Sequence, residues 1–245
     1  MPKFHIRREA VSGNRVAFDE GETRHLVRVL RLGRGDLVQA TDGQGSEFTV
    51  RLEEVGRRLA TGRILARCDG ATESPVAITL AQGIPKANKM DWIVKTVTEL
   101  GAIRVMPLLT ARCVGRLTLS GWRERARRWQ RIAKEAAKQC GRAVVPQVTP
   151  PLALSEFVAD GLAFDLAICL WEEERQGLST ILDSASATPA SALIIVGPEG
   201  GLAVEEVDLL RGRGVKTAGL GPRILRTETA GPVGVALLQA RFGDL

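Results

Sequence analysis

The sequence predicts an α/β protein with two domains, a small β-barrel at residues 1–72 and a larger domain with a parallel sheet at residues 73–245. In the first part, short alternating strands are broken by glycine. In the second part, apolar strands alternate with amphipathic helices, which is typical of β-α-β units. With 245 residues, 44% of them hydrophobic, the chain is long enough to bury a core in each domain.

The first domain is predicted to be a small basic barrel. A short helix over residues 23–32 carries Arg28 and Arg31 around its apolar face. A barrel of this kind suits binding to nucleic acid, and a protein-docking module is the alternative. The expected strands are residues 15–18, 36–40, 47–52 and 62–67.

The second domain begins after the polar segment 68–75, which contains Gly and Pro. The clearest helix of the chain follows at residues 121–140. Its Trp122 and Trp129 belong to an apolar stripe, so we expect them to anchor the core rather than to stack on bases. The other elements are expected at residues 76–80, 90–100, 103–109, 154–159, 164–170 and 177–184.

Basic residues are concentrated in the middle of the chain. Residues 86–142 carry 14 Lys and Arg against 4 Asp and Glu, a net charge of +10, whereas the whole chain carries +6. Such a block predicts a polyanionic partner, most commonly nucleic acid; a solvated helix face is the alternative. We expect phosphate contacts from Arg28, Arg31, Lys86, Lys89, Arg127, Arg131, Lys134, Lys138 and Arg142.

Two glycine turns are expected at one edge of the sheet. A buried strand at 193–196 ends in GPEGG, residues 197–201, and a second glycine turn at 219–222 follows a helix over 204–214. Because Gly lets the backbone approach a ligand closely, the two turns are predicted to form a pocket for a flat polar molecule such as adenine. GPEGG alone is equally compatible with an ordinary α/β turn.

The residues that are absent exclude several classes of protein. Two histidines, His5 and His25, are too few for a His-rich metal site, and P-loop and dinucleotide motifs are missing. The four cysteines are scattered, without a CxxC pair. With no long apolar run and no signal-peptide pattern, we expect a cytoplasmic protein without a membrane partner.

Five sequence blocks, which span almost the whole chain, identify a family resemblance. They are HLVRVLRLGRGD at His25 to Asp36, QCGR at Gln139 to Arg142, GPEGG at Gly197 to Gly201, LGPRILRTETA at Leu220 to Ala230 and ALLQARFGD at Ala236 to Asp244. With these blocks the chain resembles the RsmE family, AdoMet-dependent methyltransferases of the SPOUT superfamily. Members of that family methylate N3 of a uridine in the 16S rRNA of the small ribosomal subunit.

The resemblance implies a SPOUT-type α/β trefoil-knot methyltransferase domain preceded by a small PUA-like β-barrel domain that binds RNA. It also implies a homodimer whose two chains jointly form each site, and the small ribosomal subunit as partner. AdoMet would bind across three strand ends. The contacts implied are Leu170, Val196, Gly197, Glu199, Gly200, Leu220, Gly221, Ile224, Leu225 and Thr227.

Two residues are candidates for catalysis. Arg226 would stabilise negative charge on the uracil oxygens, and Glu228 would accept the N3 proton if burial raises its pKa. Alternatively, Thr227 and Glu228 only cap the last helix, where the helix dipole favours an ionised carboxylate. Pro232 departs from the family pattern, so the last helix is expected either to start later, near Gly231, or to be kinked.

Two other functions stay open at this level. One is a SPOUT enzyme that acts on another base or another RNA, and the other is a non-catalytic RNA-binding assembly factor. The intact LGPRILRTETA block argues against the assembly factor. A nucleotide hydrolase is excluded, because it would need a P-loop or metal ligands.

Overall fold

The computed structural model describes residues 1–69, 73–113 and 117–245, which form two compact units. The first unit contains Met1–Glu73 and Ala137–Val145, and the second contains Ser74–Ala136 and Pro146–Leu245. The predicted boundary after residue 72 borders the segment 70–72, which lies outside the described residues. The first unit also includes the return segment Ala137–Val145, so no single boundary divides the chain into these two units.

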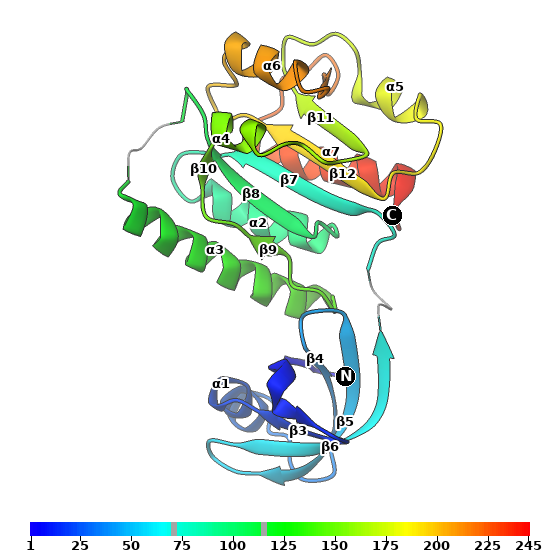
Figure 1. The fold of residues 1–245 in the computed structure, drawn as a ribbon. Helices are drawn as coiled ribbons and strands as arrows, with labels where there is room; N and C mark the ends of the chain where they lie inside the picture. Colours follow the sequence, from blue (N-terminus) through cyan, green and yellow to red (C-terminus); the bar gives the residue numbers. More distant parts are fainter. Residues whose placement is uncertain (70–72, 114–116) are drawn as a thin grey trace. The chain divides into compact units, whose positions relative to one another are not determined.

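The first unit is built on a six-stranded sheet (Figure 1). Its order is β1 (Lys3–His5), β4 (Leu37–Thr41), β5 (Ser46–Val55), β6 (Ala60–Asp69), β3 (Arg15–Phe18) and β2 (Val11–Ser12). The β1 and β4 pairing is parallel and the others are antiparallel. A short 3-10 turn, η1 (Arg8–Ala10), precedes β2.

The predicted basic helix begins earlier in the chain than expected. Helix α1 (Glu20–Arg24) continues as a π-helical turn, η2 (His25–Val29). The Asp19 carboxylate accepts a hydrogen bond from the Glu22 N–H at 2.9 Å, which explains the early start because it caps the first turn. Leu26 is fully buried in the core, where the rings of Phe4 and Phe18 pack edge to face at 5.7 Å.

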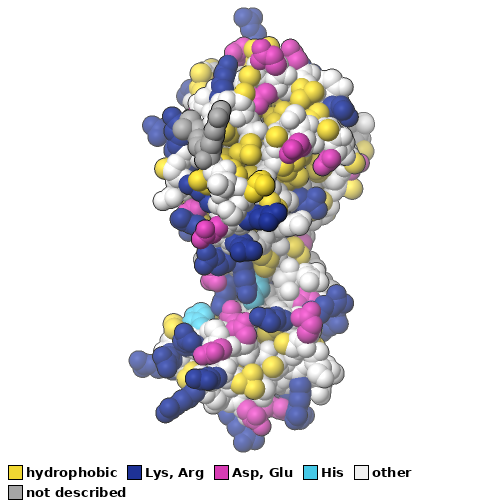
Figure 2. All heavy atoms as spheres, turned by 60° about the vertical axis from the view of Figure 1, so that its left-hand side comes forward, with side chains coloured by type: hydrophobic (Ala, Val, Ile, Leu, Met, Phe, Trp, Pro, Cys, Tyr) yellow, Lys and Arg dark blue, Asp and Glu magenta, His cyan; other side chains and the backbone are white. Residues whose placement is uncertain are grey.

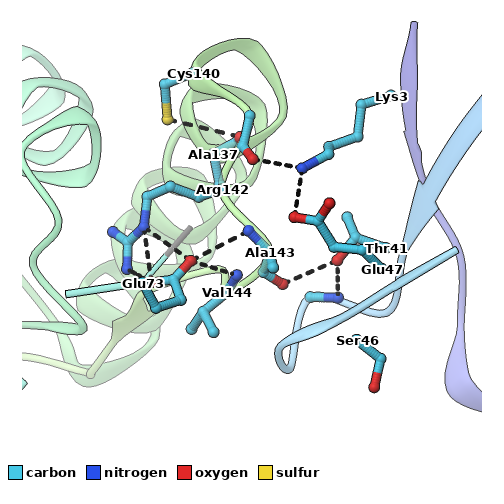
Figure 3. Close-up of polar contacts among 12 residues, drawn as sticks. Lys3, Thr41, Ser46, Glu47, Glu73, Ala137, Cys140, Arg142, Ala143 and Val144 are labelled. Atoms are coloured by element: carbon cyan, nitrogen blue, oxygen red, sulfur yellow. Dashed lines mark hydrogen bonds and ion pairs between the residues drawn. The ribbon is translucent and has the colours of Figure 1, made fainter. Parts of the chain in front are cut away.

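The return segment is held within the first unit by a largely buried ion pair (Figure 3). The Arg142 guanidinium donates to Glu73 Oε2 at 2.6 Å, and Glu73 Oε1 accepts the N–H groups of Ala143 and Val144 at 3.1 and 3.0 Å. The Thr41 hydroxyl donates to the Ala143 carbonyl at 2.9 Å. The Lys3 ammonium donates to the carbonyl of Gly141. Strand β4 and the N-terminus therefore depend on residues about a hundred positions later in the chain.

The second unit contains a seven-stranded sheet in which every pairing among the described strands is parallel, as predicted. Strands β7 (Ala77–Gly83) and β12 (Ser191–Val196) lie at its centre. On one side follow β8 (Arg104–Leu109) and β10 (Leu152–Ala153), with β9 (Gln147–Val148) also paired to β8. On the other side follow β11 (Leu166–Leu170) and β13 (Lys216–Ala218).

Helices cover both faces of this sheet (Figure 1). One core contains side chains of α2 (Lys89–Glu99), α3 (Leu119–Cys140), α5 (Leu178–Asp183) and α7 (Thr227–Phe242). The other contains side chains of α4 (Leu154–Ala159) and α6 (Val204–Arg211). The alternation along β12 explains the division, because Ile194 belongs to the first core and Leu193 and Ile195 to the second. Trp122 and Trp129 are buried in the first core, which confirms them as core anchors.

Helix α7 begins at Thr227 and runs through Pro232, so the expected late start near Gly231 is wrong. Pro232 has no N–H, and the helix therefore loses one hydrogen bond, to the carbonyl of Glu228. Close packing on the sheet compensates. A Cβ on Gly231 would lie 3.0 Å from Gln82 Oε1, and one on Gly234 would lie 3.0 Å from Leu170 Cδ1. These two glycines let the helix approach the ends of β7 and β11.

Replacing Arg142 by Met is expected to lower the free energy of unfolding by about 3–5 kcal/mol, because the Glu73 carboxylate loses its counter-charge. Urea denaturation followed by circular dichroism measures the loss. The matched control is Arg63→Met, since the Arg63 side chain is 54% exposed in its pair with Glu53 and the expected cost is below about 1 kcal/mol. Equal losses would contradict the structural role. Unchanged stability with weaker RNA binding would support the phosphate contact predicted from the sequence.

Candidate functional site

A cleft of about 340 Å³ lies at the carboxyl ends of β11, β12 and β13. This is the edge of a parallel sheet where ligands bind in α/β proteins. Three loops line the cleft, one after each strand. Of the residues that the sequence assigned to the cofactor or to catalysis, it brings together Leu170, Val196, Gly197, Glu199, Leu220, Gly221, Ile224, Leu225, Arg226 and Thr227.

Two of the assigned residues do not line the cleft. Gly200 faces Arg112, whose guanidinium donates to the Gly200 carbonyl at 2.8 Å. Glu228 is instead ion-paired with Lys89, a lining residue that the sequence assigned to RNA phosphates. Not every residue of the GPEGG loop therefore lines the cleft. Gly200 instead connects the loop to Arg112, in the segment after β8.

A buried polar cluster of Gln82, Gly197 and Thr227 holds the cleft together. The Thr227 hydroxyl donates to the Gly197 carbonyl at 2.6 Å. The Gln82 amide, fully buried at the end of β7, donates to the Thr227 hydroxyl at 2.9 Å and to the Gly197 carbonyl at 3.3 Å. The expected N-cap role of Thr227 is wrong, because Arg226 occupies the N-cap position and has no side-chain capping bond.

Part of the cleft wall is bare backbone, as the glycine turns predicted. Gly219 donates its N–H to the Gln176 carbonyl at 2.8 Å, and its own carbonyl accepts the N–H of Leu178 at 2.9 Å. A Cβ at Gly219 would lie 2.5 Å from the Glu174 carbonyl oxygen, a distance that no side chain tolerates. Gly221 has φ 92°, which favours glycine. The second glycine turn is thus packed directly against the loop after β11.

Three charged side chains meet at one side of the cleft, where Lys89 and Glu199 belong to the lining and Glu228 lies next to them. The Lys89 ammonium lies 3.0 Å from Glu199 Oε1 and 3.1 Å from Glu228 Oε2. Burial raises the pKa of Glu228, but its own backbone N–H, Lys89 and Arg226 outweigh burial, so the pKa is lowered. The pKa of Glu199 is lowered by a similar balance, and that of Lys89 is raised by Glu199 and Glu228. The shift at Glu228 is opposite in direction to the one on which its expected role as proton acceptor depends.

The residues assigned to RNA phosphates differ in their surroundings. Arg28, Arg31, Lys86, Arg127 and Arg131 are exposed, and Lys134 is half-buried. Lys138 instead donates to Glu22 Oε2 at 2.7 Å, and Arg142 is paired with Glu73. Figure 2 shows one face of the molecule, where hydrophobic side chains on the larger unit are bordered by Lys and Arg and also by Asp and Glu. RNA contact by any of the nine stays a prediction.

Several residues that line the cleft, or that hold its lining in place, were missed by sequence reasoning. Gln82 is a polar residue that ends a buried apolar strand, and that interruption is the signal by which it could have been found. Trp171 and Glu172 follow β11 in a run of acids that resembles an ordinary solvated loop. Arg223 lies within the LGPRILRTETA block.

Neither a membrane span nor a metal site is found in the part of the chain that the structure describes. None of its helices is long and apolar enough to cross a membrane. None of its clusters of His, Cys, Asp or Glu reaches the three side chains that would hold a metal ion.

The fold and the cleft define a two-unit α/β protein with a ligand site at the carboxyl edge of a parallel sheet. The RNA methyltransferase domain family matches residues 72–239, and the RNA methyltransferase PUA domain family matches residues 18–65. The chain belongs to this RNA methyltransferase family.

Relatives and solved structures agree with this membership. Ribosomal RNA small subunit methyltransferase E of Bacillus subtilis is 36% identical over 85% of this chain and 83% of its own, and that of Synechocystis is 33% identical over 92% and 73%. The Neisseria gonorrhoeae enzyme of that name, bound to S-adenosyl methionine, superimposes with a TM-score of 0.89 at 30% identity, covering 100% of this chain and 99% of its own. A putative methyltransferase from Legionella pneumophila with bound SAM gives 0.88 at 31%, covering 99% and 98%.

Replacing Thr227 by Val is expected to lower the free energy of unfolding by about 1–3 kcal/mol, because the buried Gln82 amide loses an acceptor and the Gly197 carbonyl loses a donor. Urea denaturation measures the loss, and Thr180→Val on the exposed face of α5 is the control. Combining Thr227→Val with Gln82→Leu should cost less than the sum of the single changes, by at least about 0.5 kcal/mol. Simple additivity would show that the two side chains act independently.

Proposed function

We propose that this protein transfers a methyl group from AdoMet to N3 of a uridine in the 16S rRNA of the small ribosomal subunit. The observation that carries the proposal is the loop-lined cleft, at the sheet edge where ligands bind, in a chain of the RNA methyltransferase family. Relatives named ribosomal RNA small subunit methyltransferase E support the choice of substrate.

The residues of the cleft fit AdoMet. Its volume of about 340 Å³ lies within the range of small-molecule sites. Apolar side chains of Leu170, Val196 and Leu225 provide surface for an adenine ring, and the side-chain-free backbone at Gly219 and Gly221 lets a flat ligand approach closely. The carboxylate of Glu172 at the wall suits a cationic ligand. Related structures hold S-adenosyl methionine, which supports the same assignment here.

Bound AdoMet supplies an activated methyl group, and the protein supplies position and charge. In the proposed transfer, uridine N3 loses its proton and bonds to the methyl carbon as the carbon–sulfur bond breaks, so in-line placement carries much of the rate. Arg226 lines the cleft, and its guanidinium would donate to a uracil oxygen as negative charge develops there. Glu228, ionised beside Lys89, would accept the N3 proton after the base has entered, as a weaker base than the sequence predicted because its pKa is lowered rather than raised.

RNA binding would use both units. The exposed side chains of Arg28 and Arg31 in the first unit, and of Lys86, Arg127 and Arg131 in the second, would contact phosphates with half-buried Lys134. The match of residues 18–65 to an RNA methyltransferase PUA domain supports this use of the first unit. A trefoil knot in the second unit and a cytoplasmic location belong to the same proposal, on the resemblance to the RsmE family.

The decisive experiment incubates the protein with labelled AdoMet and small ribosomal subunits that lack modifications, and maps the product by mass spectrometry. Methyl on uridine N3 is expected. Arg226→Ala should lower kcat by about 10²–10³ with little change in the Kd for AdoMet measured by calorimetry. Arg213→Ala, an exposed arginine outside the cleft, is the control.

Other outcomes of that experiment select the alternatives. Label on another base, or only on another RNA, would point to a different specificity within the same superfamily. AdoMet binding without any label would favour a non-catalytic assembly factor. Full turnover by Arg226→Ala would refute the role of that guanidinium.

We also propose that the protein is a homodimer, as the resemblance implies. Trp92 on α2 is 50% exposed and Leu237 on α7 is 39% exposed, on two helices that pack against each other. Sedimentation velocity at micromolar concentration is expected to give a dimer, and Trp92→Glu should shift it toward the monomer because it places a charge in an apolar contact. A monomeric wild-type protein would contradict this proposal.

A further inference from the structure

The side chain of Lys89 connects the loop after β12 to the first turn of α7. Lys89 begins α2, Glu199 belongs to the loop after β12, and Glu228 lies in the first turn of α7. The Lys89 ammonium lies 3.0 Å from one carboxylate and 3.1 Å from the other. The three side chains are 32%, 24% and 19% exposed, so solvent reaches the cluster only in part.

Glu199 also binds the backbone of the segment that precedes Lys89. Both oxygens of Glu199 accept the Lys86 N–H, at 3.0 and 3.1 Å. Ala87 follows with φ 55°, a conformation that residues other than glycine rarely adopt. Backbone strain of this kind persists only where the surroundings enforce it, and it is concentrated at functional sites. Glu199 therefore fixes this turn through an amide and fixes Lys89 through its charge.

We propose that Lys89 is a positioning residue for methyl transfer, which holds the Glu228 carboxylate next to the cleft lining and connects it to the GPEGG loop. This inference rests on the proposed function. It differs from the phosphate contact predicted from the sequence, because the two carboxylates that face this ammonium offset its charge and weaken its attraction for a phosphate. Glu228 Oε2 is buried and makes no hydrogen bond of good geometry to the described residues, so it depends on the charge of Lys89.

The charges around Glu228 show what the loss of Lys89 would do. Burial raises the pKa of Glu228, while its own N–H, Lys89 and Arg226 lower it. Without Lys89, Glu228 and Glu199 would face each other with Arg226, their own backbone N–H groups and the Lys86 N–H to offset them. The pKa of Glu228 would then rise, because burial and a like charge both disfavour the ionised form. As pH falls, the variant would lose the ionised carboxylate before the wild-type protein does.

The test compares wild type, Lys89→Met and Lys89→Arg in methyl transfer to small ribosomal subunits. The ratio of kcat/KM at about pH 8 to that at about pH 6 should rise roughly threefold to tenfold in Lys89→Met relative to wild type. Deprotonation of the uridine contributes equally to the pH dependence of kcat/KM in every variant. Lys89→Arg keeps the charge and should restore the wild-type ratio. Lys95→Met removes an exposed charge from the same helix and should leave the ratio unchanged.

An activity-independent readout accompanies the kinetics. Titration of the Glu228 side-chain carboxyl carbon by NMR, in the full chain, should give a higher midpoint in Lys89→Met than in wild type. This measurement distinguishes a failure of the proposed function from a failure of the role of Lys89. A wild-type protein without methyl transfer refutes the proposed function, while an unchanged Glu228 midpoint refutes the electrostatic role of Lys89.

Two kinetic results would overturn the inference. An equal loss of rate at every pH in Lys89→Met would reduce Lys89 to a residue needed only for folding. A higher KM for the ribosomal subunit with an unchanged pH ratio, and a salt dependence weaker by about one phosphate contact, would restore it as an RNA contact.

Discussion

The cleft depends on one fully buried amide. Gln82 lies one residue before the end of the central strand β7, and its amide donates to both the Thr227 hydroxyl and the Gly197 carbonyl. Water cannot replace these bonds, because the Gln82 side chain has no exposed surface. Gln82 therefore fixes the chain after β12 and the start of α7 relative to the sheet, as well as relative to each other.

Close main-chain packing extends this positioning through the rest of the site. A Cβ on Gly83 would lie 2.7 Å from the ring of Pro198, and one on Gly197 would lie 2.8 Å from the carbonyl carbon of Gly201. Such approaches are possible only where no side chain intervenes. As a result, backbone atoms form much of the wall, and their N–H and C=O groups cannot rotate away as side chains can. A rigid wall suits the recognition of one flat ligand.

Much of the fold could be predicted because its signals are local. The periodicity of α3 and the apolar run of β12 depend on neighbouring residues, and both were found where expected. Pro232 shows where a local rule fails, since the packing of Gly231 and Gly234 on the sheet outweighs one missing helix bond. Local rules predicted a break there because they do not include the sheet beneath.

The roles of the charged residues were the least predictable part of the site. A count of Lys and Arg treats all of them as available to an anion, yet Lys138 is bound to Glu22, which lies 116 residues earlier. Arg142 and Lys89 likewise have carboxylate partners that are distant in the sequence. Spacing gives no sign of such pairs, because they form only after the chain has folded. Composition alone therefore could not distinguish these paired residues from exposed arginines of α3 such as Arg127 and Arg131.

The return segment has a consequence for the order in which the protein folds during synthesis. The first unit is discontinuous, and Glu73, Thr41 and Lys3 all take partners from residues 141–144. When residue 73 leaves the ribosome, these partners have not yet been made, so the N-terminal sheet must wait without them while β7, β8 and most of α3 are translated. The smaller unit is therefore completed by a segment that arrives after the larger one has begun to form.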